Sequence, residues 1–121
     1  MATKSQSFRE VTVWQKAHAF ALAVYRCTDS FPRHELFALT SQLRRSAASV
    51  PANFAEGFRK RTGPDKLRFY NTAQGSADEC LYHLILAHDL GYADTRPLQD
   101  GIEEVSRLLQ GYINGLERNS S

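Results

Sequence analysis

The sequence has little cysteine and no long apolar run. Its 121 residues include only Cys27 and Cys80, which form no CxxC or other paired spacing. Two isolated thiols of this kind act as small buried side chains in a reducing compartment, so we expect no disulfide. No segment approaches the roughly 20 apolar residues that a membrane span needs. Charged residues also interrupt the first twenty residues, unlike a signal peptide. These absences predict a soluble, cytoplasmic protein with no membrane partner.

Motifs for catalysis and cofactor binding are absent as well. The chain has no GxxxxGKS/T, GxGxxG, HExxH or GxSxG motif, and its four histidines are scattered. His83 follows Glu79 by four residues and Cys80 by three, which raises the possibility of a metal site. A di-iron bundle needs ExxH on two helices, however, and His18 has no carboxylate one turn away. We therefore expect no enzymatic activity, no cofactor and no metal.

What the chain does contain is helical periodicity along nearly its whole length. Apolar residues recur at steps of three and four, and no alternating run with a hairpin turn competes with this pattern. The pattern predicts one all-α domain over residues 1–121, with helices at about 11–29, 36–60, 64–90 and 95–117. For the second helix, starts near Glu35 and at Thr40 are both open. Pro32, the Gly63-Pro64 pair and Gly91 mark the breaks, and Asp94 or Thr95 can cap the last helix.

Short links between these helices favour an antiparallel up-down-up-down four-helix bundle. The last helix has the clearest core stripe, with Leu98, Ile102, Val105 and Leu109 in the spacing of a bundle seam. The first and third helices carry apolar residues on more than one stripe, which exceeds what one central core needs. This excess predicts that the protein associates with further copies of itself.

A proline lies inside the second predicted helix. Pro51 removes the helical donor for the carbonyl of Ala47 and follows the small residues 46–49, so we expect the helix to bend there. Small side chains let a neighbouring helix approach closely, which favours a structural role for the bend. A bend that opens a ligand pocket is the functional alternative.

A polar stripe runs beside the apolar stripe of the same helix. If the stripe is buried, its charged members need partners, and Glu79 of the third helix is a candidate ion partner for Arg45. A solvated flank explains the stripe equally well. The candidate structural network consists of Gln42, Arg45, Asn53, Glu56 and Glu79, with Ser49 on the same stripe.

Charge is distributed unevenly along the chain. The net charge is +2, but residues 44–68 have seven basic residues against Glu56 and Asp65, and residues 69–121 have eight acids against three arginines. The turn between the second and third helices is therefore basic, which indicates binding to RNA or DNA. A solvated charged turn is the alternative. The candidate contacts are Arg44, Arg59, Lys60, Arg61, Lys66 and Arg68.

Two segments of the second helix carry a family resemblance. The sequence reads LTSQLRR at 39–45 and SVPANFAEG at 49–57. In these segments it resembles the four helix bundle family first known from open reading frames inside intervening sequences of bacterial large-subunit ribosomal RNA genes. The likeness covers nearly all of residues 8–116 and includes Val13, Trp14, Gln15, Phe31, Pro32, Glu35, Gly75, Ser76, Glu79, Leu90, Gly91 and Tyr92.

The resemblance implies a four-helix bundle that assembles into a ring-like pentamer. It also implies likeness to an accessory protein of diversity-generating retroelements that binds nucleic acid through a basic surface. Two residues depart from the family pattern, because Ala38 and Arg59 stand where glycine is frequent. Ala38 favours a longer helix, and Arg59 adds a charge to the basic turn.

Three hypotheses follow from the sequence. The first is a homo-oligomeric protein that binds RNA or DNA, and the second is a homo-oligomeric scaffold for a protein partner without a nucleic-acid role. An enzyme is the third and the least supported, because no constellation of catalytic residues is present.

Overall fold

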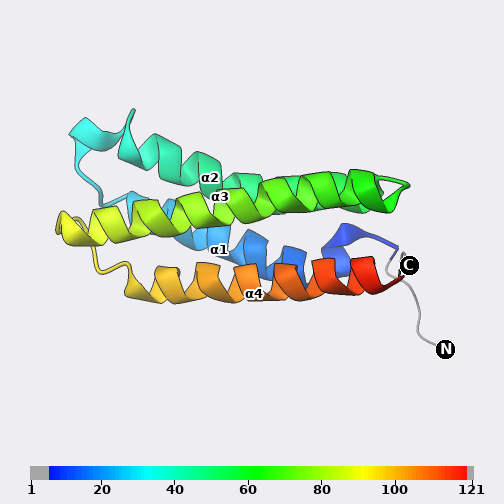
Figure 1. Cartoon of the computed structure of the whole chain (residues 1–121). Helices are drawn as coiled ribbons and strands as arrows, with labels where there is room; N and C mark the ends of the chain where they lie inside the picture. Colours follow the sequence, from blue (N-terminus) through cyan, green and yellow to red (C-terminus); the bar gives the residue numbers. More distant parts are fainter. Residues whose placement is uncertain (1–5, 120–121) are drawn as a thin grey trace.

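Four α-helices form the structure, a computed structural model that describes residues 6–119. They are α1 (Thr12–Thr28), α2 (Leu39–Arg59), α3 (Gly63–Asp89) and α4 (Arg96–Asn119), with short 3-10 turns η1 (Phe8–Glu10) and η2 (Arg33–Glu35). Consecutive helices run in opposite directions, and α1 and α3 each pack against both α2 and α4 (Figure 1). Residues 6–119 contain no strand. The predicted all-α, up-down-up-down bundle is confirmed.

The core lies along the stripes that the sequence indicates. On α2, Leu39, Leu43, Ala47, Val50 and Phe54 are all buried. The seam predicted on α4 is likewise buried, except that its first residue is only partly covered. Helical structure continues without a break through Pro51, which is buried, and the bend expected there stays a prediction. The remaining buried apolar residues are Val13, Ala17, Phe20, Ala21, Val24, Phe31, Tyr70, Ala73, Ala77, Cys80, Leu84, Ala87 and Ile113.

One helix start differs clearly from the sequence prediction. α2 begins at Leu39, one residue before the alternative start at Thr40, and not at 36, because residues 36–38 form a turn after η2. Ala38 precedes the helix with φ −124° and ψ −105°, which is not a helical conformation. The longer helix expected from Ala38 is therefore wrong, and Phe37 lies on a turn. The other helix ends fall within two residues of their predicted positions.

Both ends of α3 follow from local chemistry. The Thr62 hydroxyl accepts a hydrogen bond from the Asp65 N–H at 3.2 Å, and Pro64 occupies the first turn. At the other end Gly91 has φ 77°, a conformation that favours glycine. The Tyr92 N–H then reaches back to the Ala87 carbonyl at 3.0 Å. The stop predicted at Gly91 is confirmed as a left-handed helix cap.

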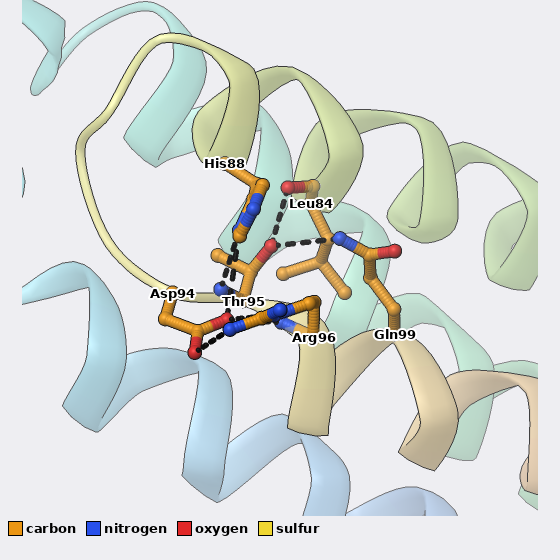
Figure 2. Close-up of polar contacts among 6 residues, drawn as sticks. All are labelled: Leu84, His88, Asp94, Thr95, Arg96 and Gln99. Carbon is orange, nitrogen blue, oxygen red and sulfur yellow. Dashed lines mark hydrogen bonds and ion pairs between the residues drawn. The ribbon is translucent and has the colours of Figure 1, made fainter.

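Thr95 ties the start of α4 to the end of α3 (Figure 2). Its buried hydroxyl donates to the Leu84 carbonyl at 2.6 Å and accepts from the Gln99 side-chain amide at 3.1 Å. Its backbone N–H donates to Nδ1 of His88 at 3.4 Å. A residue of the link between two helices is thus bonded to both of them, which fixes how α4 leaves α3.

Asp94 caps the same helix end. Its carboxylate accepts from the backbone N–H of Arg96 at 3.1 Å and forms an ion pair with the Arg96 guanidinium at 2.8 Å (Figure 2). These hydrogen bonds hold the pKa of the Asp94 carboxyl well below its usual range. Of the two residues predicted as the cap, Asp94 binds the N–H of the first helical residue. The Thr95 hydroxyl does not bind this N–H and donates instead to the Leu84 carbonyl of α3.

Glu35 holds the turn before α2 against the link after α3. The Tyr92 hydroxyl donates to its carboxylate at 2.8 Å, and the Leu39 N–H donates to the other carboxylate oxygen at 3.4 Å. These two hydrogen bonds, the Tyr92 bond above all, lower the pKa of Glu35 from its usual 4.5. A negative charge at the first N–H of α2 also suits the helix dipole.

The stabilising effect of this carboxylate should disappear in acid. Because its folded pKa is lower than its unfolded pKa, it stabilises the fold above about pH 4.5, and the contribution is lost as the pH falls through the folded pKa. We expect urea denaturation to show a Glu35→Gln variant less stable than wild type near neutral pH. That difference should shrink as the pH is lowered to about 3.

Glu103→Gln is the matched control for this prediction. Glu103 is exposed on α4 and makes no hydrogen bond or ion pair within residues 6–119. At every pH we expect the Glu103→Gln variant to have the same free energy of unfolding as wild type. A gap between wild type and Glu35→Gln that stays constant across the acid range would show that Glu35 acts by packing and not through its charge.

Candidate nucleic-acid interface

Three consecutive basic residues, 59–61, lie where α2 ends and the link to α3 begins. Figure 1 shows this link at one end of the bundle. α2 ends at Arg59, and Lys60 turns the chain with φ −71° and ψ 155° while its N–H still binds the Gly57 carbonyl at 3.1 Å. Arg59 and Arg61 are exposed, and Lys60 is half-buried. We name Arg59, Lys60, Arg61 and Arg68 the turn surface.

Arg68 joins this surface through an aromatic ring. The Lys60 ammonium lies 5.0 Å from the centroid of the Phe69 ring, and the Arg68 guanidinium lies 5.3 Å from it. Both distances are in the range of cation–π attraction. The ring therefore holds two like charges near each other. Because both cations lie against this ring, Phe69 is less accessible as a platform for a stacked base.

Lys66 has a different task from the other predicted contacts. Its ammonium donates to the Phe58 carbonyl at 2.7 Å and to the Gly57 carbonyl at 3.4 Å, and it lies 5.5 Å from the Phe58 ring. These carbonyls belong to the last turn of α2, where a positive charge offsets the helix dipole. Partial burial lowers the pKa of Lys66. Lys66 thus caps the C-terminal end of α2, and its ammonium is already bound by these carbonyls.

Arg44 lies away from the turn surface. Its guanidinium donates to the Thr28 hydroxyl at 2.7 Å, pairs with Asp29 at 3.1 Å and lies over the Tyr25 ring at 5.0 Å. Fifteen residues of α2 separate it from Arg59, which is about 22 Å at the helical rise per residue. The structure therefore brings together five of the six predicted contacts and places Arg44 at the opposite end, where it joins α1 to α2.

The polar stripe of α2 faces solvent for most of its length. Gln42, Arg45 and Glu56 are exposed, as is Glu79 on α3. None of the four forms a hydrogen bond or ion pair within residues 6–119, so the ion pair considered between Arg45 and Glu79 is not made there. Their side chains keep their hydration, which costs less than burying them.

Only Asn53 of the predicted network makes hydrogen bonds in the described chain. Its amide donates to the carbonyl of Ser49 at 2.9 Å and to the Ser49 hydroxyl at 2.8 Å. The Ser49 hydroxyl also pairs with that of Ser76 on α3 at 2.9 Å. The polar stripe therefore contributes only a small polar contact to α3 within the described residues, among Ser49, Asn53 and Ser76. Sequence reasoning missed Ser76 because no pattern shows which residues of two helices face each other.

An apolar groove of about 420 Å³ lies between α1 and α2. We name it the α1–α2 groove; its lining includes Trp14, His18, Leu22 and Tyr25 from α1 and Ala48 and Ala52 from α2. The Trp14 and His18 rings stack at 4.9 Å between centroids. Alanines spaced along α2 leave the space open, because they have no side chain long enough to fill it. Sequence analysis interpreted residues 46–49, Ala48 among them, as points of close helix contact, and kept a pocket opened by a bend at Pro51, which also lines this groove, as the alternative.

Residues 6–119 also bear on metal binding and on membrane insertion. No group of three or more His, Cys, Asp or Glu side chains in this part of the chain is placed to hold a metal ion. Within the same residues, no helix has the length and apolar character required to cross a membrane.

A match to a known protein family includes the residues of the candidate interface. The family model described as 23S rRNA-intervening sequence protein matches residues 9–111. The chain belongs to this family. All of α1, α2 and α3 fall within the match, so the turn surface and most of the α1–α2 groove lie in the part that the 23S rRNA-intervening sequence proteins share. The resemblance inferred from LTSQLRR and SVPANFAEG is confirmed.

A solved structure has the same fold as this 23S rRNA-intervening sequence protein. It is a protein of unknown function of the S23 ribosomal protein family from Bacteroides thetaiotaomicron, with a TM-score of 0.76 and 24% sequence identity. The likeness covers 84% of this chain and 98% of the other. At this identity it supports the fold alone. No curated protein matches the chain.

Proposed function

We propose that this protein is a non-enzymatic, cytoplasmic homo-oligomer that binds RNA or DNA through its turn surface. The assembly is a ring, which the family resemblance implies to be a pentamer, and each subunit contributes one copy of Arg59, Lys60, Arg61 and Arg68. A bend of α2 at Pro51, beside the α1–α2 groove, would wrap this helix around the bundle.

One observation carries the proposal. Four cations meet at the α2–α3 end of the bundle, and no carboxylate within residues 6–119 lies in ion-pair distance of any of them. Cations that have no acidic partner remain available to phosphate groups, and each phosphate they neutralise releases a counterion. Lys66 and Arg44 are excluded from this set because carbonyls and Asp29 already hold them.

Repetition in a ring would raise the affinity for a long polyanion. A single surface of four cations binds weakly at physiological salt, but linked copies act at a high effective concentration once the first is bound. The contacts are with the phosphate backbone, so the binding has little sequence preference. Exposed apolar side chains on α1, Leu22 and Tyr25, agree with the self-association that such a ring requires.

A second candidate function is a scaffold for a protein partner. The observation that favours it is exposed apolar surface at the C-terminal end of α3, where Tyr82 is 60% exposed and Ile85 39%, and where Leu90, which follows the helix, is 51% exposed. Such a surface fits a partner protein better than a nucleic acid. Substitution of the turn surface would leave this interaction intact, so the two functions separate in the experiment below.

The test is binding to a generic single-stranded RNA, measured by fluorescence anisotropy between about 50 and 200 mM salt. We expect the affinity of the wild-type protein to fall steeply with salt. In an Arg59→Ala/Lys60→Ala/Arg61→Ala variant we expect at least a roughly tenfold loss at low salt. The slope of log affinity against log salt should also become shallower, by about 0.7 for each phosphate contact removed.

A variant with the same loss of charge elsewhere is the control. Arg26, Arg33 and Arg107 are exposed on α1, η2 and α4, outside the turn surface, and make no ion pair within residues 6–119, so their triple alanine variant should bind RNA nearly as well as wild type. Equal losses in both variants would indicate a general charge effect and not a site. Absence of RNA and DNA binding even at low salt would overturn the proposal, and a partner protein retained by both variants would favour the scaffold.

A further inference from the structure

Phe37 is the most exposed large apolar side chain in the described chain. It is 93% exposed, on the turn between η2 and α2, and the neighbouring Leu36 is 46% exposed. A full phenyl ring held in water by an ordered turn gains nothing for its own fold. Exposed apolar groups of this kind mark a surface that is covered by another molecule.

The α1–α2 groove is the complementary feature on the same chain. It has a volume of about 420 Å³, and no Asp, Glu, Lys or Arg lines it. A benzene-sized ring fills a cavity of about 150 Å³, so the groove accommodates a phenyl ring with room for an adjacent aliphatic side chain. Leu36 is adjacent to Phe37. The uncharged segment of residues 36–38 therefore matches an uncharged groove in size and polarity.

We propose that Phe37 of one copy of the chain inserts into the α1–α2 groove of a second copy. The inference rests on the self-association in the proposed function and names its contact. Phe37 does not fill its own groove, because its side chain is 93% exposed and is not among the residues that line the groove. Knob and groove lie at different places on one chain, so the contact is head-to-tail and repeats around a closed ring.

A second copy as the occupant is bound at two places on every subunit of a ring, once at its knob and once at its groove. Each contact buries one phenyl ring, which contributes about 150–250 Å², and Leu36 on the knob side and the half-exposed Leu22 and Tyr25 on the groove side add apolar surface. One such contact is smaller than the roughly 800 Å² per partner of a stable pairwise interface. Closure of the ring, which ties each subunit to two neighbours, therefore contributes to the stability of the assembly.

Variants that remove the knob or fill the groove test the contact. Phe37→Ser removes the ring at a site exposed enough that the fold is retained, and Ala52→Trp fills the groove from its exposed rim. Sedimentation velocity gives the protein concentration below which the oligomer dissociates into smaller species. For both variants we expect this concentration to be at least about tenfold higher than for wild type. Tyr82→Ser, which removes an exposed aromatic ring on α3, should assemble like wild type.

Mixing the two variants distinguishes a head-to-tail contact from other arrangements. Phe37→Ser retains an open groove and Ala52→Trp retains the knob, so the mixture should form a one-to-one dimer that cannot grow or close. A photo-crosslinking amino acid in place of Phe37 should, in the full-length oligomer, label peptides of α1 and α2 from a different copy.

The outcomes separate this inference from the proposed function. Wild-type protein that stays monomeric at all concentrations would overturn both. Wild-type oligomers that Phe37→Ser leaves unchanged, or crosslinks to any other surface, would overturn the Phe37 contact and leave the oligomer and its RNA binding standing.

Discussion

Replacing Phe54 with alanine should lower the free energy of unfolding by about 3–5 kcal/mol, the range measured for large aromatic side chains deleted from protein cores. Phe54 is fully buried on α2. Its ring stacks on Tyr70 at 5.1 Å and meets the edge of Tyr112 at 5.1 Å, and those two tyrosines contact each other at 5.6 Å. Three helices therefore meet at this ring, and its loss leaves a cavity that none of them can fill without moving.

Urea denaturation at one fixed protein concentration is the measurement, because association adds to apparent stability. Tyr82→Ala is the control: it deletes a similar ring at an exposed position, and we expect a change within about 0.5 kcal/mol. A loss of less than about 1 kcal/mol at Phe54 would mean that the aromatic cluster rearranges around the gap and does not determine how α2, α3 and α4 pack.

The layout of the bundle could be predicted because each helix carries its own signals. The stripe from Leu39 to Phe54 follows the helical period, and Gly91 permits the backbone that ends α3. The choice between the two starts considered for α2, near Glu35 or at Thr40, could not be made in this way. It depends on Glu35 and Tyr92, which are 57 residues apart in the chain and meet only after the bundle has formed. Local propensity at Ala38 pointed to helix, and the tertiary contact prevailed.

The candidate site could be predicted only in outline. A run of three basic residues at a turn is visible in the sequence, but the separate tasks of Lys66 and Arg44 are not. Lys66 binds carbonyls that lie eight and nine residues earlier, across the turn. Arg44 reaches back to residues of α1. Each of these two cations is bound by groups that come together only when two helices pack side by side. Counting charges along the chain cannot distinguish Lys66 and Arg44 from the cations of the turn surface.

Replacing Gly57 with alanine should lower the free energy of unfolding by about 1–3 kcal/mol, the usual cost of overpacking. Gly57 is buried in the last turn of α2 against the N-terminal part of α3. A Cβ there would lie 2.7 Å from Cε1 of Tyr70 and 3.0 Å from Cβ of Phe69. Neither atom can move easily, because the Tyr70 ring is stacked on Phe54 and the Phe69 Cβ is next to the backbone of α3.

The same substitution elsewhere in the bundle should have the opposite sign. Gly111 lies on the exposed face of α4, and a Cβ added there meets nothing within 4 Å. Gly111→Ala should therefore stabilise the protein by about 0.5–1 kcal/mol through the higher helix propensity of alanine. If Gly57→Ala were instead stabilising to the same degree, α2 and α3 would have to lie farther apart here. Phe69, and the Lys60 and Arg68 charges beside its ring, would then also be displaced from the positions that form the turn surface.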